Sequence, residues 1–250
     1  MFDQHTAQRI VASEWKRFID RFETRHDDER AVLDDWTLTD LAAHCDTAIE
    51  QQTEAFRRGV VGRMEPPALD TVAKSRDERL LSLRANATAL ADIIGSLTPE
   101  QIGAMTPLPF GVVPTMVAMQ IAGLEAGFHR YDAEAAFDPD CRLDSDVAST
   151  LLDMVPGLAP MLAAGVWATS GAPTTPIAYR LIGSTRTVDL SFDGTAWIPA
   201  PSTGDTIAVR GDDQAVALFF MGRRTLDHLS LSVEGDPVAA RRFKEFFPGP

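Results

Sequence analysis

The spacing of apolar residues changes once along this chain, and that change limits the possible folds more than any other feature. Up to about residue 140, apolar residues recur every three or four positions with little strand-like alternation, which predicts amphipathic helices. Beyond it, short β-prone runs alternate with turn sequences such as GSTRT and DGT, which predicts strands. We therefore expect an α-helical domain over 1–142 and a smaller α+β domain over 143–250.

The first domain is expected to contain four helices that pack as a bundle. The first carries Trp15 on its apolar side, and the second begins at Thr37, where T-x-x-D predicts a capping box. The third runs from about Leu69 to Leu97, and the fourth begins after Pro114. The connection RRGVVGRMEPPALD is rich in Gly and Pro, which favours a loop, with a mobile lid as the alternative.

The second domain is expected to mix strands and helices. Helices are predicted over 147–167, 212–222 and 236–247, and strands over 177–183, 187–192, 196–200, 206–211 and 229–233. Five phenylalanines fall in its helices at helical spacing, which favours core packing over the lining of a lipid tunnel. They are Phe219, Phe220, Phe243, Phe246 and Phe247.

Charge and hydropathy exclude several classes of partner. The formal charge of −13 would repel nucleic acid and offers no basic face to anionic lipid. The most apolar stretch carries Asp153, Pro156 and Pro160, which makes it a poor membrane span. The segment MFDQHTAQRIVASEW has no long apolar run, so we expect a cytosolic protein. Cys45 and Cys141 are expected to be reduced, packed thiols.

Glu125 and His129 stand four residues apart in the helical segment PTMVAMQIAGLEAGFHRYDAEAAF, so their side chains share one helix face. They form either a plain hydrogen-bonded pair or two ligands of a divalent ion. An inward-facing Glu125 among Ala118, Ile121 and Ala122 would need a cation or a hydrogen-bonding partner. His44, in a second apolar helix, completes a two-His, one-carboxylate set, which leaves a position open as in catalytic zinc sites.

Residues near the three candidate ligands have weaker assignments. Asp132 lies three residues after His129 and is a candidate to accept the imidazole N–H that a metal would leave free, which would fix the tautomer of His129. Its alternative is a surface acid paired with Arg130. Cys45 points about 100° away from His44 around the helix and is not expected to be a ligand. The remaining histidines lie in polar surroundings and are expected to be solvated; they are His5, His26 and His228.

These segments together resemble the mycothiol-dependent maleylpyruvate isomerase family of the DinB-like superfamily, over essentially the whole chain. WTLTDLAAH, which ends at His44, is similar to the family's W-t-x-x-D-l-x-x-H segment, and EAGFHRYD is similar to its E-x-x-x-H-x-x-D segment. Glu125 in place of the histidine common in DinB-like proteins indicates the isomerase-like branch. The stretch from Val209 to the final FFPG resembles the family's carboxyl-terminal domain. Met221 departs from the family pattern, in which Trp or another large residue often precedes the Gly-Arg step.

The resemblance implies a DinB-like four-helix bundle followed by a sterol-carrier-like α+β domain. It also implies Zn²⁺, or another divalent metal, bound by His44, Glu125 and His129, and mycothiol or a similar small thiol as cosubstrate. The expected enzyme is an isomerase of a maleylpyruvate-like keto acid or a thiol S-transferase. Arg223 is implied to hold an anionic substrate group, and its alternative is a cation at the carboxyl end of a helix.

Two questions stay open at the level of sequence. A chain of charge −13 repels a dianionic substrate unless a local basic patch overrides it, so a neutral electrophile is equally compatible. The alternative to an enzyme is a metal-stabilised binding or regulatory module with a pocket for an apolar ligand. Thiol-dependent turnover would separate the two classes.

Overall fold

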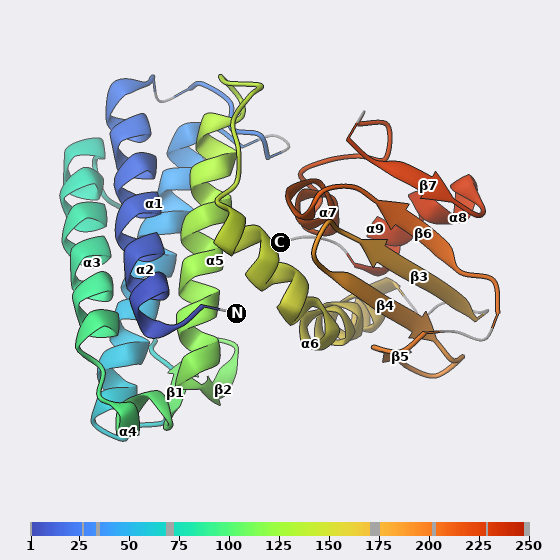
Figure 1. The fold of residues 1–250 in the computed structure, drawn as a ribbon. Coiled ribbons are helices and arrows are strands. Elements are labelled where there is room, and N and C mark those ends of the chain that lie inside the picture. Colours follow the sequence, from blue (N-terminus) through green and yellow to red (C-terminus); the bar gives the residue numbers. More distant parts are fainter. Residues whose placement is uncertain are drawn as a thin grey trace. The chain divides into compact units, whose positions relative to one another are not determined.

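The protein is described by a computed structural model that covers residues 2–26, 28–33, 36–68, 73–170, 176–201, 204–228 and 230–247. The chain divides into two compact units, Phe2–Leu143 and Asp144–Pro250, drawn in Figure 1. The first is helical and the second contains a five-stranded sheet, so the predicted mixed fold class is confirmed. Within the described ranges, no helix has both the length and the apolar character needed to cross a membrane.

The first unit is built around four long helices, as predicted. They are α1 (Gln4–Thr24), α2 (Leu38–Val60), α3 (Arg76–Ser96) and α5 (Thr115–Glu134). Helix α1 packs against α3 and α5, and α2 also packs against both, as Figure 1 shows. The large side chains between them, including Trp15, Phe18 and Phe56, have at most 1% of their surface exposed. Burial of these apolar faces is the main source of the bundle's stability.

Capping residues explain where α2 and α3 begin. Thr37 caps α2 with a reciprocal capping box to Asp40, which confirms the predicted start. The predicted start of α3 at Leu69 is wrong, because the described helix begins at Arg76. There Ser75 accepts from the backbone N–H of Glu78 and the Glu78 carboxylate accepts from that of Ser75, which favours a helix start at this point. Residues 69–72 lie outside the described part of the chain.

A short hairpin before α5 was not predicted. After the one-turn helix α4 (Pro99–Ile102), strands β1 (Met105–Leu108) and β2 (Gly111–Pro114) pair antiparallel. These strands are too short, and too rich in proline and glycine, to show a clear period of two. The hairpin leads directly into α5, which begins at Thr115 just after Pro114, as predicted.

The second unit begins with helix α6 (Ser145–Ser170) and continues into a mixed sheet. The strands are β3 (Ile177–Ile182), β4 (Thr187–Phe192), β5 (Trp197–Ile198), β6 (Ile207–Arg210) and β7 (Ser232–Glu234), in the order β5-β4-β3-β6-β7. Among the described strands, β3 and β6 pair parallel, and the other three pairings are antiparallel. All five predicted strands are present: β4 has the predicted bounds, β3, β5 and β6 are shorter than predicted, and β7 ends one residue later.

Aromatic side chains fill the core of this unit. Helices α7 (Asp213–Phe220), α8 (Pro237–Arg241) and α9 (Phe243–Phe246) surround a cluster in which Tyr179 lies edge-on to Phe243 at 5.0 Å. The single helix predicted over 236–247 is therefore wrong, because the chain turns at Arg242 between two short helices. The five phenylalanines are buried. Four of them pack against one another and Phe246 packs against Tyr179 and Trp197, which confirms the prediction of a core.

Candidate metal centre

Helices α2 and α5 bring His44, Glu125 and His129 together. Each residue offers one ligand atom, and these three atoms all lie within 4.8 Å of one another. The imidazole rings of His44 and His129 approach to 5.0 Å between centroids and are nearly perpendicular. Glu125 and His129 occupy successive turns of α5, with Glu125 Oε2 3.2 Å from His129 Nε2. One helix thus supplies two donors and its neighbour supplies the third.

Helix α5 is buried over most of its surface, which places charged groups in the interior. Small residues such as Ala118, Ala122 and Gly123 let neighbouring segments approach closely. A Cβ atom at Gly123 would lie only 2.4 Å from the Phe2 ring, so a larger residue here would displace that ring. His129 follows on this buried helix with 7% of its surface exposed. Such a side chain needs hydrogen-bonding partners on both ring nitrogens.

Asp132 is the second partner of His129. Its carboxylate lies 3.2 Å from His129 Nδ1, and Asp132 has no exposed surface. Arg130 pairs with Glu14 and Glu134 instead, so the alternative of Asp132 as a surface acid paired with Arg130 is wrong. When Nδ1–H donates to Asp132, Nε2 carries the lone pair on the side of Glu125.

In the absence of a metal, these two carboxylates change the acidity of His129. Burial lowers the pKa of the imidazole, but hydrogen bonds to Asp132 and Glu125 and their negative charges outweigh burial and raise it to about 9. The ring is then protonated at neutral pH, and both of its N–H groups face a carboxylate. The Nε2 proton therefore occupies the position that a cation between His129 and Glu125 would take.

The cluster is open on one side, which corrects part of the sequence expectation. The side chain of Glu125 is 32% exposed, and His44 is exposed, so neither faces a closed apolar interior. Leu41 and Cys45 take the buried face of α2, which turns His44 toward the surface. The prediction that Glu125 faces inward is therefore wrong: its carboxylate is half-buried and has His129 as a partner, and the fully buried acid of the cluster is Asp132.

Two tryptophans flank the histidines and were not predicted as part of the site. The Trp36 ring lies 5.4 Å from that of His44, and the Trp15 ring lies 6.3 Å from that of His129. Trp36 belongs to the segment WTLTDLAAH, so its position near His44 could have been expected. Trp15 resembles any other core residue of an amphipathic helix, and the sequence carries no signal of its contact with His129.

The two cysteines are packed thiols and the three other histidines are exposed, as predicted. Burial, together with the negative charges of Glu125 and Asp132, raises the pKa of Cys45 well above its usual value, so it stays a thiol. Burial also raises the pKa of Cys141 to about 11. Both cysteines are free and buried. The histidines expected to be solvated are exposed; they are His5, His26 and His228.

Arg223 belongs to the second unit, where it ends helix α7. Its backbone N–H donates to Leu218 O at 2.7 Å and that of Gly222 donates to Phe219 O at 3.0 Å, with Gly222 at φ 77°. These bonds form a Schellman motif, which explains the Gly-Arg step. The Arg223 guanidinium donates to Met221 O at 2.8 Å, a contact that fits the alternative of a helix-terminal cation.

The fold and the residue cluster define a class, a helical bundle with a possible metal site joined to an α+β unit. Two solved structures are similar to the chain: a mycothiol-dependent maleylpyruvate isomerase (TM-score 0.59, 14% identity) and its histidine-to-alanine variant (TM-score 0.67, 12% identity), each with 93% of both chains covered. No protein-family model and no curated protein matches the sequence. At this identity the similarity establishes the fold. The division into DinB-like and sterol-carrier-like domains stays a prediction.

Proposed function

We propose that this chain is a metal-dependent enzyme that uses a low-molecular-weight thiol to isomerise or conjugate a small electrophile. The observation that carries the proposal is the convergence of His44, Glu125 and His129, with ligand atoms within 4.8 Å of one another. The fold shared with solved mycothiol-dependent maleylpyruvate isomerases supports the choice of a thiol as cosubstrate.

The two imidazoles and one carboxylate are ligand types that Zn²⁺ prefers. Two imidazoles and one carboxylate are a common set of three protein ligands at catalytic zinc sites. Asp132 fixes the His129 tautomer that leaves Nε2 available. The exposure of His44 and Glu125 leaves access for a fourth ligand from solution. Cys45, buried and protonated, does not compete for the ion.

Zinc bound here would supply Lewis acidity that lowers the pKa of a thiol, so that the thiolate persists at neutral pH. Glu125 balances one of the two positive charges of the ion, and Asp132 keeps the His129 ring oriented. Two neutral imidazoles preserve a net positive charge at the centre, which favours an anionic sulfur. The residues thereby hold and activate the nucleophile, and they do not themselves act as one.

The same nucleophile accounts for both reaction classes. In an isomerisation, the sulfur forms a bond to one carbon of a cis double bond, and the electron pair moves onto a conjugated carbonyl as an enolate. Rotation about the resulting single bond follows; the pair then returns, the carbon–sulfur bond breaks, and the trans isomer leaves. In a transfer, the enolate takes up a proton and the thioether is the product. A group that stabilises the enolate or holds a substrate carboxylate speeds either reaction, and Arg223 is proposed for this role.

The test loads purified protein with Co²⁺ and titrates it with mycothiol. We expect about one Co²⁺ per chain and a sulfur-to-cobalt charge-transfer absorption that grows with thiol. His44→Ala should lose both, whereas the matched variant of an exposed histidine, His5→Ala, should keep both. Absence of metal binding by the unaltered protein would refute the centre. Metal binding without a thiol-dependent absorption or turnover would instead favour the non-catalytic module.

A further inference from the structure

We infer that helix α1, which supplies none of the three candidate ligands, positions His129 through a two-residue contact with α5. Adjacent residues of α1, Glu14 and Trp15, hold adjacent residues of α5, Arg130 and His129. This inference rests on the proposed metal centre and assigns positioning roles to Glu14, Trp15 and Arg130. None of these three touches the candidate ion or the reacting atoms.

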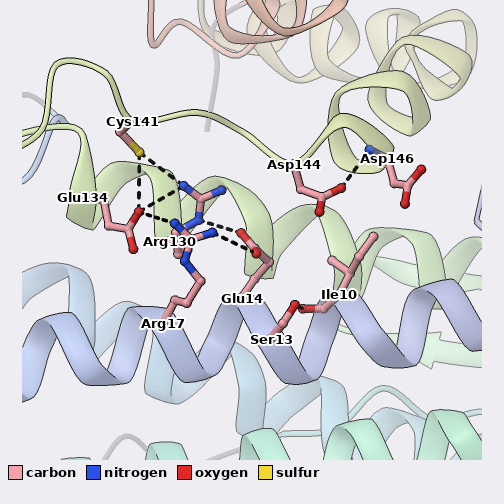
Figure 2. Close-up of polar contacts among 9 residues, drawn as sticks. All are labelled: Ile10, Ser13, Glu14, Arg17, Arg130, Glu134, Cys141, Asp144 and Asp146. Atoms are coloured by element: carbon pink, nitrogen blue, oxygen red, sulfur yellow. Dashed lines mark hydrogen bonds and ion pairs between the residues drawn. The ribbon is translucent and has the colours of Figure 1, made fainter.

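The first half of the contact is a buried ion pair. Arg130 Nε donates to Glu14 Oε2 at 2.6 Å, and their side chains are 0% and 3% exposed. Arg130 also donates to Glu134 at 3.2 Å, and Glu134 accepts from Arg17 at 2.8 Å. Figure 2 shows these two arginines and two carboxylates with Cys141 Sγ, which lies 3.2 Å from Arg130 Nη1. The two arginines and two carboxylates balance in charge, and their ion pairs fix the position of α1 relative to α5 along the helix axes.

The second half of the contact is aromatic. The Trp15 ring lies 6.3 Å from the His129 ring at an interplanar angle of 31°, and Trp15 has no exposed surface. Trp15 thereby packs beside the imidazole on the α1 side, while the Asp132 carboxylate lies 3.2 Å from its Nδ1. The ring also moves with any rotation of α5, and the adjacent Arg130, paired with Glu14, opposes that rotation.

Helix geometry explains why this control matters for a metal. Consecutive side chains point about 100° apart around a helix, so fixing His129 and Arg130 together fixes both the rotation and the height of α5. At a side-chain radius of about 5 to 6 Å, a rotation of about 10° moves the tip by about 1 Å. Metal–ligand distances tolerate only about 0.2 Å. A small change in the rotation or axial position of α5 therefore disrupts metal binding before it unfolds the bundle.

The chemistry of the ion pair favours orientation over stability as its role. A buried ion pair gains little net stability over apolar residues of similar size, because desolvation offsets its attraction. Its geometry, however, is directional, and a guanidinium bonded to two carboxylates resists rotation. Replacing the pair with apolar residues should therefore keep the fold and loosen the registration.

The test uses the full chain and measures Co²⁺ affinity by chelator competition, the Co²⁺ ligand-field spectrum, and urea unfolding of the metal-free protein. The double variant Glu14→Leu/Arg130→Met and the single variant Trp15→Phe should lower Co²⁺ affinity about 10- to 100-fold, the loss typical of removing a supporting shell. Their spectra should also shift. A second, milder variant, Glu14→Gln, keeps the test valid if the double variant fails to fold.

The matched control is Glu23→Gln, which breaks an exposed ion pair between α1 and α3, Arg84 Nη2 to Glu23 Oε2 at 2.6 Å. It should leave affinity and spectrum unchanged. If Glu14, Trp15 and Arg130 have a purely structural role, their variants should be less stable to urea but should keep the Co²⁺ affinity and spectrum of the unaltered protein. That result would overturn the positioning role and leave the proposed metal centre in place. Failure of the unaltered protein to bind Co²⁺ would overturn the metal centre, and the inference with it.

Discussion

The carboxylate of Asp132, which has no exposed surface, lies 3.2 Å from Nδ1 of His129. A buried carboxylate on the imidazole selects which ring nitrogen carries the proton and which carries the lone pair. In the neutral ring that a metal requires, the lone pair is directed to the side of Glu125, whose Oε2 lies 3.2 Å from Nε2. The orientation of one candidate ligand is therefore built into α5, independently of any ion.

Asp132→Asn is expected to weaken metal binding about 10- to 100-fold. The amide donates where the carboxylate accepted, which favours the tautomer with the proton on Nε2 and removes the lone pair from the ligand position. Chelator competition with Zn²⁺ measures the effect. Asp92→Asn changes an exposed acid of α3 and serves as the control, and equal affinities in the two variants would exclude the role of Asp132.

Metal binding is expected to release about one proton at pH 7. The pKa of His129 in the metal-free protein is raised to about 9, above its usual 6.5, by Asp132 and Glu125 against the effect of burial. A metal requires the neutral ring, so the apparent affinity should rise about tenfold per pH unit toward pH 9. Calorimetry in buffers of different ionisation enthalpy counts the protons, and an affinity independent of pH between 7 and 9 would contradict this assignment.

The same shift makes the metal-free fold sensitive to alkaline pH. Because the folded-state pKa of His129 is raised, its contribution to stability is complete below about pH 6.5 and is lost as the pH rises through about 9. The urea midpoint of the metal-free protein should fall between pH 7 and 9.5. In His129→Gln, which cannot titrate, this part of the decrease should be absent.

The sequence predicts the bundle well because the apolar stripes of its helices repeat over five or six turns. It also predicts the start of α2 at Thr37, where the capping box is a local feature. The predicted start at Leu69 is wrong because the apolar pattern continues upstream of the capping box at Ser75, where the helix begins. The sequence does not indicate the hairpin over 105–114, because its strands are short and its contacts with α2 and α5 join segments distant in sequence.

The candidate ligands could be predicted because spacing and residue type carry most of the information. Glu125 and His129 share a helix face because they are four residues apart. Two ligands rarely hold zinc, so a third donor is needed, and His44 lies in a second apolar helix. The support of the site could not be predicted. Trp15 and Glu14 approach His129 and Arg130 across more than 100 positions of sequence, and such pairs depend on tertiary packing rather than on any periodicity.

Removal of single candidate ligands should separate metal binding from stability. His44→Ala and Glu125→Gln should each reduce metal content well below one per chain by elemental analysis, because two ligands rarely retain zinc. His44 is exposed, so its variant should remain folded without metal. The stabilisation that excess Zn²⁺ gives the unaltered protein should vanish in both variants. Full metal content in each variant would remove the centre.

Arg223→Ala is expected to lower turnover of a carboxylate substrate about ten- to a thousand-fold without changing zinc content, because one charged donor to a developing enolate contributes on that scale. Arg223→Lys should recover part of the loss, since an ammonium cannot reproduce the guanidinium fork. The alternative role, a cation at the carboxyl end of α7 that donates to Met221 O, predicts lower stability with unchanged turnover per folded molecule. The neighbouring variant Arg224→Ala removes a contact to Ser230 and controls for a general loss of charge. Wild-type kinetics in Arg223→Ala, together with a lower unfolding midpoint, would assign Arg223 to the helix end alone.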